Sequence, residues 1–300
     1  MMNGLSPLRN TSYDVNIPAN AKWAQKGKTI AKGNGGGGAT NQLYWSLGLF
    51  VDDDQTVVIA DNSNGRIMQW KKGDATNGQI VAGGKDQGNG LNQLQYPTDI
   101  LIDIETDSLI ICDYGNRRVV RWPRQSGTTQ GEILIDNIDC YGLAKNDQRS
   151  DKNGTLVAGG HGKGADCNQL NGPGYIFVDR QQAVYVSDHN NHRVMKWNKG
   201  ATEGTVVAGG QGEGSALTHL HHPEGLVLDT LGTLSVSDST NHRVMRWPKG
   251  ATQGTVIVGG NGEGEGANQF NRLIGLSFDR HGNLYIVDDH NHRVQRFSIQ

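Results

Sequence analysis

Apolar residues along this chain fall in short runs, and polar residues and glycines follow each run. The stretch 219–260 shows the pattern clearly, with runs at 225–229, 233–238, 243–247 and 255–260. Short runs that are rich in β-branched residues and bounded by Gly, Pro or Asn predict β-strands, and no run has the spacing of an amphipathic helix. We therefore predict that each such stretch forms four strands joined by hairpin turns.

The same stretch recurs at a fixed spacing. Segments 188–197, 238–247 and 288–297 begin 50 residues apart and share the order Asp, Asn, Arg, Val and a final Trp or Phe. A supersecondary unit repeated at this period predicts a repeat architecture. Four-stranded units predict the radially arranged sheets of a β-propeller.

The number of blades follows from counting equivalent strands. The innermost strand recurs six times, at 47–52, 99–103, 141–145, 175–179, 225–229 and 275–279. The outermost strand also recurs six times, at 28–33, 79–84, 132–136, 155–160, 205–210 and 255–260. These counts predict an all-β, six-bladed propeller.

One repeat is shorter than the others. The signature occurs at 61–70 and 113–122, and its next copy starts 75 residues after the second, at Asp188. In between, residues 141–154 lead almost directly into 155–160. We predict that the third blade lacks its two middle strands and is truncated to two strands. The alternative is a ring of five blades that closes tightly, with this stretch as a connector.

The two ends of the chain predict how the ring closes. The C-terminal end stops after a third strand, 293–297, and the N-terminal part contains an isolated fourth strand at 28–33. Pairing them completes the C-terminal blade and removes two open sheet edges. We therefore expect residues 21–300 to form the propeller and residues 1–20 to be a poorly structured leader.

Composition narrows the classes of partner and compartment. Charged residues make up 19% of the chain and balance to a net charge of −2, so no global charge attracts nucleic acid or an anionic membrane. Apolar runs are too short to span a bilayer, and the first residues lack the pattern of a secretory signal. Cys112, Cys140 and Cys167 show no metal-type spacing, and unpaired cysteines favour a reducing, cytoplasmic location. Sequons at Asn10 and Asn153 leave an extracellular origin open if the chain is a piece of a longer secreted protein.

The signature Asp-x-x-Asn-x-Arg-Val-x-x-Trp/Phe resembles the NHL repeat. The family triplet Asn-His-Leu corresponds here to Asn-His-Arg at 191–193, 241–243 and 291–293, and the resemblance covers residues 21–300. It implies a propeller fold and a link to ubiquitin ligases, although three scattered cysteines do not supply the zinc domain that such ligases carry. Kelch and WD repeats match less well, because the aromatic residues after the kelch Gly pair and the WD dipeptides are missing.

Each complete repeat carries an Asp five residues before an Arg. A pair present in every blade cannot mark a single active site, and Arg offers a planar fork of donors that a carboxylate accepts. We therefore predict a structural hairpin lock rather than a catalytic pair. The pairs are Asp61/Arg66, Asp113/Arg118, Asp188/Arg193, Asp238/Arg243 and Asp288/Arg293.

Histidines and carboxylates raise the question of a metal enzyme. In the amidating lyases, which have a similar fold, histidines from several blades hold zinc in the channel. Here one blade supplies His221 and His222 to the predicted channel entries, so we expect no three-histidine site there. The other signature histidines are predicted at hairpin tips: His189, His192, His242, His290 and His292.

Calcium-dependent, lactonase-like propellers need clustered channel carboxylates, and Glu224 and Asp99 alone do not form such a cluster. We predict no catalytic residue, no metal and no cofactor. A metal-dependent propeller enzyme, of the amidating-lyase or lactonase-like kind, is kept as an alternative.

Residues that differ between otherwise repeated units are the candidates for recognition. At the entries to the innermost strands these rim residues are Tyr44, Trp45, Tyr96, His221, His222 and Arg272. Aromatic side chains and Arg are types that anchor interfaces. We predict a monomeric, non-catalytic scaffold that binds a protein or peptide partner through this rim. In the alternative interpretation, Tyr44 and Trp45 plug the channel mouth.

RNA binding is a further alternative. Related NHL propellers bind RNA through a basic face, and one basic residue per blade recurs here, at Arg121, Lys196, Arg246 and Arg296. Four spaced cations in a chain of net charge −2 are weak support, since RNA-binding surfaces combine dense positive charge with stacking aromatics.

Overall fold

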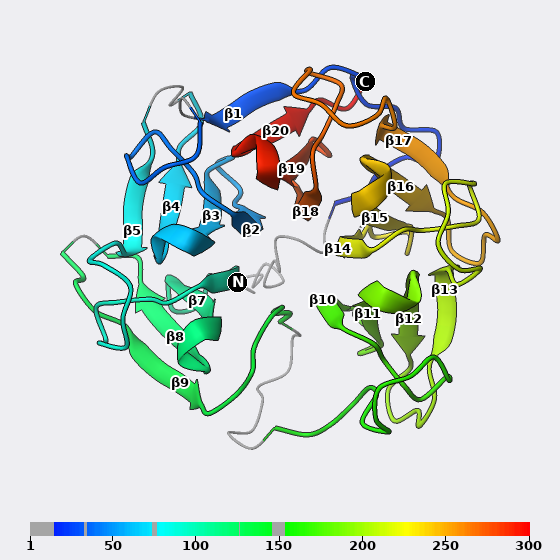
Figure 1. The fold of residues 1–300 in the computed structure, drawn as a ribbon, viewed down its shortest axis with the longest axis horizontal. Helices are drawn as coiled ribbons and strands as arrows, with labels where there is room; N and C mark the ends of the chain where they lie inside the picture. Colours follow the sequence, from blue (N-terminus) through cyan, green and yellow to red (C-terminus); the bar gives the residue numbers. More distant parts are fainter. Residues whose placement is uncertain (1–14, 33–34, 74–76, 126, 146–153) are drawn as a thin grey trace, which may run out of the picture.

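The computed structural model describes residues 15–32, 35–73, 77–125, 127–145 and 154–300. These residues form five four-stranded antiparallel sheets that stand radially around a central axis (Figure 1). Within each sheet the strands follow one another outward as a meander, which is the arrangement that the four apolar runs of each repeat predict.

Four blades are continuous in sequence. Blade 1 contains β2 (Ser46–Val51), β3 (Val57–Asp61), β4 (Arg66–Trp70) and β5 (Gln79–Gly83). Blade 2 contains β6 (Pro97–Asp103), β7 (Ser108–Asp113), β8 (Arg118–Pro123) and β9 (Glu132–Asp136). Blade 3 contains β10 (Pro173–Val178), β11 (Val184–Asp188), β12 (Arg193–Trp197) and β13 (Thr205–Gly209). Blade 4 contains β14 (Pro223–Leu228), β15 (Leu234–Asp238), β16 (Arg243–Trp247) and β17 (Thr255–Gly259).

Blade 5 is assembled from both ends of the chain. It combines β18 (Leu273–Phe278), β19 (Leu284–Asp288) and β20 (Arg293–Phe297) with β1 (Lys28–Lys32) as its outer strand. Strand β1 pairs antiparallel with β20, and an isolated bridge between Trp23 and Ile299 extends the contact. The ring is therefore closed by the N-terminal strand, in the way that the two incomplete ends of the sequence indicate.

The predicted leader, residues 1–20, is described only from residue 15 onward. There Val15 and Ile17 are buried against blades 4 and 5, and the carbonyls of Ile17 and Pro18 accept hydrogen bonds from Arg246. Residues 15–20 thus pack along the edge of the propeller.

The prediction of six blades is wrong, because the described residues contain five sheets. Residues 137–145 and 154–172, the described parts of the segment between β9 and β10, form no strand, and Figure 1 shows them between blades 2 and 3, where another sheet would stand. The inner and outer strands of a complete blade lie about 14 Å apart, which is three spacings of about 4.8 Å, and the two middle strands bridge that distance. Without middle strands, segments 141–145 and 155–160 have no neighbour within a blade, and they form neither strands nor a truncated blade.

The connector nevertheless fills the inner side of the gap. The backbone N–H of Leu143 donates a 2.8 Å hydrogen bond to Asp99 of β6. Tyr141 stacks edge-on against Tyr114 of blade 2 on one side and Tyr175 of blade 3 on the other. Around the axis, this short segment therefore lies beside the innermost strands of the five blades, in the position that the innermost strand of a sixth blade would have.

A disulfide fixes the same segment. Cys112 of β7 is bonded to Cys140, with their Cα atoms 5.6 Å apart, while Cys167 is free and exposed. The expectation of three unpaired cysteines is wrong, and with it the argument from cysteine usage for a reducing compartment, since disulfides persist in oxidising ones. Among the described residues, no helix is long and apolar enough to cross a membrane.

The repeat residues have structural roles that explain their recurrence. Trp197 at the end of β12 is buried, and its ring covers Gly204, where an added Cβ would lie 2.7 Å from the indole. The same Trp–Gly packing occurs in blade 4 between Trp247 and Gly254. Glycine is needed at these turns because the indole leaves no room for a side chain.

An Asp–Arg ion pair forms at the equivalent place in all five blades. The Nε–Oδ2 distances are 2.6 or 2.7 Å, and the carboxylates are fully buried. In blade 4, Asp238 also accepts the backbone N–H of His221 at 2.7 Å, and Arg243 donates to the carbonyls of Ser215 and Ala216. The pair therefore ties the β15–β16 hairpin to the loop that enters the blade, which is a structural role.

Candidate functional site

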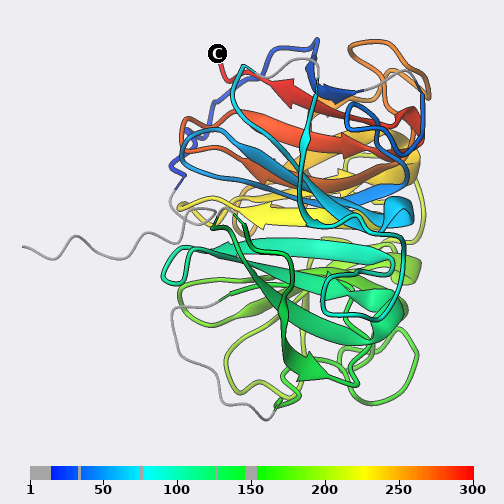
Figure 2. The same cartoon turned by 90° about the vertical axis from the view of Figure 1, so that its left-hand side faces the viewer.

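The predicted rim residues all lie on one face of the ring, which we call the turn face. Each blade has a short 3-10 turn between its second and third strands on this face: η1 (Asn62–Asn64), η2 (Tyr114–Asn116), η3 (His189–Asn191), η4 (Ser239–Asn241) and η5 (Asp289–Asn291). Figure 1 views this face, and the turns lie along the right-hand side of Figure 2. The carbonyls of the entry loops accept hydrogen bonds from the turns, as Tyr44 does from Ser63 and His221 from Thr240.

The residue just before each innermost strand has a left-handed backbone. Its φ is 52° at Trp45, 49° at Tyr96, 52° at His222 and 61° at Arg272, while blade 3 has Gly172 at 64°. Bulky residues rarely adopt this conformation, and glycine adopts it without strain. Four of five blades therefore hold a large, different side chain where the backbone alone would favour glycine.

The aromatic rim residues occupy blades 1 and 2. Tyr44 is 43% exposed, Trp45 49% and Tyr96 44%, and Tyr114 of η2 is exposed beside them. Tyr44 packs against Trp45 and against His292 at the tip of blade 5, with ring centroids 6.4 and 5.6 Å apart. Tyr44 and Trp45 are not among the residues that line the central cavity.

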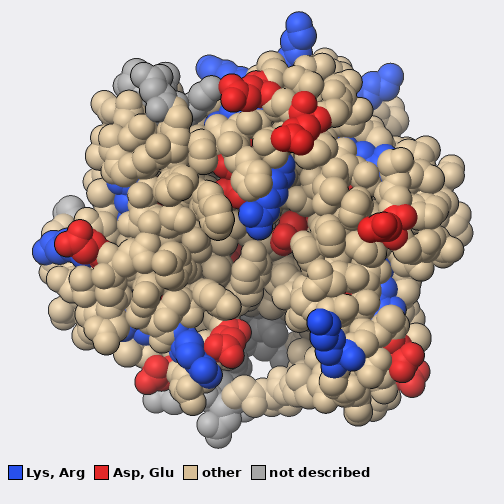
Figure 3. Space-filling view, viewed as in Figure 1, with Lys and Arg blue, Asp and Glu red and all other residues tan. Residues whose placement is uncertain are grey.

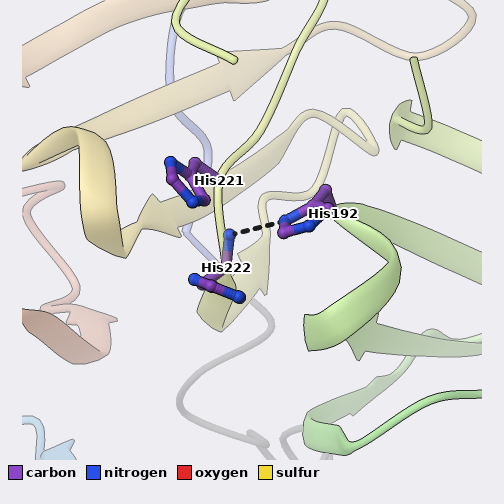
Figure 4. A group of neighbouring side chains, drawn as sticks. All are labelled: His192, His221 and His222. Atoms are coloured by element: carbon purple, nitrogen blue, oxygen red, sulfur yellow. Dashed lines mark hydrogen bonds between the residues drawn. The ribbon is translucent and has the colours of Figure 1, made fainter. Parts of the chain in front are cut away.

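Hairpin tips of one blade meet entry residues of the next, a relation that sequence reasoning missed. His192 at the tip of blade 3 lies beside His221 and His222 at the entry of blade 4, with ring centroids 5.4 and 4.8 Å away. His189 stacks on His222 at 4.4 Å. We call these four residues the histidine junction; Figure 4 shows three of them gathered from two blades. The signal in the sequence was present, since tips and entries recur about 30 residues apart, but only the fold shows that they touch.

Burial and mutual repulsion lower the pKa of two histidines of this junction. The pKa of His222 is lowered to about 4 by burial and by the neighbouring His189, His192 and His221. Burial, followed by His221, also lowers the pKa of His192. Burial alone would lower the pKa of His189, but its contact with Glu224, 3.3 Å away, outweighs that effect and raises it.

A second polar group lies at the channel mouth. Asp289 of η5 is 1% exposed, and neither of its carboxylate oxygens has a hydrogen-bond partner. Its nearest cation is Arg272, whose Nη1 is 3.5 Å from Oδ2. Burial, only partly offset by Arg272, raises the pKa of Asp289 to about 7. Figure 3 shows charged side chains of both signs near the centre of this face, in a surface that is otherwise largely uncharged.

The charges of Glu224 and Asp289 act on the hydroxyl of Tyr141, whose pKa burial and these charges raise. Further inside, Asp99 lines a central cavity of about 70 Å³, and burial raises its pKa to about 7. The mouth thus combines Glu224 with Asp289, a carboxylate that sequence reasoning did not single out because it occupies a repeated tip position.

The opposite face has a larger pocket of about 180 Å³ between blades 3 and 4. Its two carboxylates are already engaged, because Asp229 pairs with Arg246 at 2.8 Å and Asp179 accepts the Tyr185 hydroxyl at 3.2 Å. Lys196 lies 5.2 Å from the centre of the Tyr185 ring. The groups around this pocket stabilise one another, and they provide a weaker case for a ligand than the turn face.

The radial sheets place the chain in the β-propeller class. Residues 270–297 match the NHL repeat family, and this match is consistent with the NHL-repeat β-propeller that the recurring signature predicts. A search of the curated proteins finds no match.

Several solved structures share the fold. An auxiliary nutrient binding protein from Bacteroides thetaiotaomicron has a TM-score of 0.62 and 18% identity, over 96% of this chain and 75% of that chain. A catalytically inactive variant of virginiamycin B lyase from Staphylococcus aureus, with quinupristin, has a TM-score of 0.55 and 10% identity, over 92% and 99%. A luciferin-regenerating enzyme has a TM-score of 0.54 and 10% identity, over 86% and 92%. At these identities the likeness shows the fold alone.

Proposed function

We propose that this chain is a binding propeller that holds a protein or peptide partner on its turn face. The observation that carries the proposal is the left-handed entry position, where four of five blades hold a bulky side chain in place of glycine. Backbone strain of this kind persists where a side chain is needed in one orientation, and it concentrates at binding sites. The same framework repeated with different residues at one position is how repeat propellers build a specific surface.

The aromatic half of the rim supplies the anchors. Tyr44, Trp45 and Tyr96 together present a large apolar area. Their side chains have few rotatable bonds, so burying them against a partner costs little conformational entropy. Arg272 and the histidine junction lie on the same face and add polar contacts that orient the partner. A peptide rich in aromatic or aliphatic residues fits this arrangement.

Panning a random peptide library against the 300-residue chain tests the proposal. We expect enriched peptides whose affinity falls at least about tenfold for the double variant Trp45→Ser/Tyr96→Ser, since losing one interface anchor costs about 2 kcal/mol. Leu231→Ser is the matched control, because Leu231 is also about half exposed (54%) but lies on the opposite face beside the larger pocket. Peptides that bind the double variant as tightly as the unaltered chain would contradict the proposal.

An enzyme acting at the channel mouth is the second candidate. The observation that favours it is Asp289, a buried carboxylate without a hydrogen-bond partner and with a pKa of about 7, next to Arg272 and near the His189–Glu224 pair. A carboxyl group poised near neutral pH suits general acid–base chemistry, and the guanidinium suits an anionic or carbonyl-bearing substrate. The similar folds of known lyases support this only by analogy.

A panel of small lactones and esters tests the enzyme. If the unaltered chain turns over one of these substrates, a rate that falls at least about 100-fold in Asp289→Asn would support acid–base chemistry by Asp289. Asp139→Asn is the control, because Asp139 forms an exposed ion pair with Arg117. Turnover that survives Asp289→Asn would rule out this residue as the acid or base.

The contacts of the recurring basic residues do not favour the RNA alternative. Arg246 is buried in its pair with Asp229, and Arg121 pairs with Glu132 at 2.6 Å. Lys and Arg atoms on the turn face are scattered rather than gathered in a patch (Figure 3).

A further inference from the structure

We propose that His192, His221 and His222 form a binding site for a Zn²⁺ ion at the junction between blades 3 and 4. Each residue offers an imidazole nitrogen, and the three nitrogens lie within 4.8 Å of one another. The side chains come from a hairpin tip and from the neighbouring entry loop, as Figure 4 shows. This inference goes beyond the proposed partner binding and does not depend on it.

The outer contacts of two histidines leave one nitrogen free on each. His221 Nε2 lies 3.4 Å from a carboxylate oxygen of Glu213, so its Nδ1 is left to coordinate. His222 Nδ1 lies 3.2 Å from the hydroxyl of Thr240, so its Nε2 is left. Metal-binding histidines in proteins have this arrangement, in which the second ring nitrogen donates to a carboxylate or other oxygen and fixes the ring orientation.

His192 supplies the third donor. Its Nδ1 accepts a hydrogen bond of 3.3 Å from the backbone N–H of His222, so its Nε2 is left to coordinate. That hydrogen bond fixes the orientation of the ring beside the entry loop. The backbone at His192 and His222 is left-handed, with φ of 54° and 52°, which holds both side chains out from their loops toward each other.

The donor set fits zinc. Neutral imidazoles are preferred ligands of Zn²⁺, and three histidines leave a fourth tetrahedral position for water or a ligand group. All three histidines are partly exposed, so an ion can enter from solvent. The site uses one junction of adjacent blades, whereas the amidating-lyase resemblance implies histidines arranged around the channel.

The repeat itself provides a matched control. His242 and His292 have the same left-handed tip conformation as His192, with φ of 51° at each. The entry residues that follow them are Asn271 with Arg272, and Tyr44 with Trp45. Among the described residues, three histidines meet at the junction of blades 3 and 4 alone.

Zinc titration of the metal-free 300-residue chain, without a polyhistidine tag, tests the site. We expect one Zn²⁺ per chain by competition with a chromophoric chelator and by elemental analysis after desalting. His192→Asn and His222→Asn are expected to weaken binding by more than about 100-fold, and Glu213→Gln by about tenfold, the range for an outer-shell partner. His242→Asn should bind as the unaltered chain does; Asn suits these positions because it tolerates a left-handed backbone.

Two readouts separate loss of the site from loss of the fold. Zn²⁺ at a concentration well above its Kd should raise the Tm of the unaltered chain and of His242→Asn, but not of His192→Asn. Co²⁺ in place of zinc should give the strong visible absorption of a tetrahedral site. A chain that binds no zinc, or that keeps its affinity after His192→Asn, would overturn the proposal.

Discussion

At the residue scale, the recurring side chains could be interpreted from the sequence and the histidine junction could not. An Asp and an Arg that appear in every copy imply a shared structural role, and the ion pairs of Asp61 with Arg66 and of its four counterparts have that role. His192 and His222 come from different blades, and their contact depends on how the sheets are arranged around the axis. A local pattern carries no information about that arrangement, and for the same reason Cys112 gave no sign of its bond to Cys140.

Removing one carboxylate of the hairpin lock should strongly destabilise the fold. Asp238→Asn leaves Arg243 buried without its counter-charge, and breaking a buried pair in this way costs about 3–5 kcal/mol. Glu132→Gln, at an exposed pair with Arg121, is the control and should cost less than about 1 kcal/mol. Urea denaturation measures both, and equal effects would contradict the structural role of the lock.

Buried Asp289 should make stability depend on pH. Its pKa is about 7 in the folded chain against an ordinary 3.8, so the folded state binds the proton more tightly than the unfolded state. The stability gained from this proton is complete below pH 4 and is lost as pH rises to about 7, at up to about 1.4 kcal/mol per pH unit. The free energy of unfolding of the unaltered chain, minus that of Asp289→Asn, should therefore fall between pH 4 and 7. A difference that stays constant or rises would contradict the assignment.

At the scale of elements, most strands followed from the apolar runs, and the error lay in treating every strand-like run as a strand. Segments 141–145 and 155–160 resemble the inner and outer strands of other repeats, yet a strand exists only where a neighbour completes its hydrogen bonds. Because no middle strands are present in this repeat, the backbone N–H of Leu143 donates its hydrogen bond to the side chain of Asp99 instead. Strand β10 is less buried than β14 or β18, because its neighbour on one side is this connector and not another four-stranded sheet.

The disulfide should account for much of the connector's stability. It closes a loop with a sequence separation of 28, for which the chain-entropy relation gives about 3–4 kcal/mol. Cys140→Ser should therefore lower the free energy of unfolding by about that amount, and Cys167→Ser, at an exposed free thiol, should leave it almost unchanged. Alkylation followed by mass measurement checks the pairing: one label before reduction and three after it. Three labels on the unreduced chain would show that the bond is not formed.

At the scale of the whole molecule, closure was predictable and the blade number was not. The missing fourth strand at one end and the isolated strand at the other fit together as β20 and β1. The ring then brings all entries and hairpin tips to one face, so that Trp45, Tyr96, His222 and Arg272 share a surface although they are far apart in sequence. We infer that this face, rather than the channel or the opposite pocket, is what the repeated framework displays.

Hydrogen exchange with and without a saturating library-selected peptide tests that inference most directly. We predict slower exchange in the turn-face segments 44–46, 95–97, 221–223 and 271–273, with no change at 229–232 on the opposite face. Protection confined to 229–232 and 179–181, around the larger pocket, would contradict it.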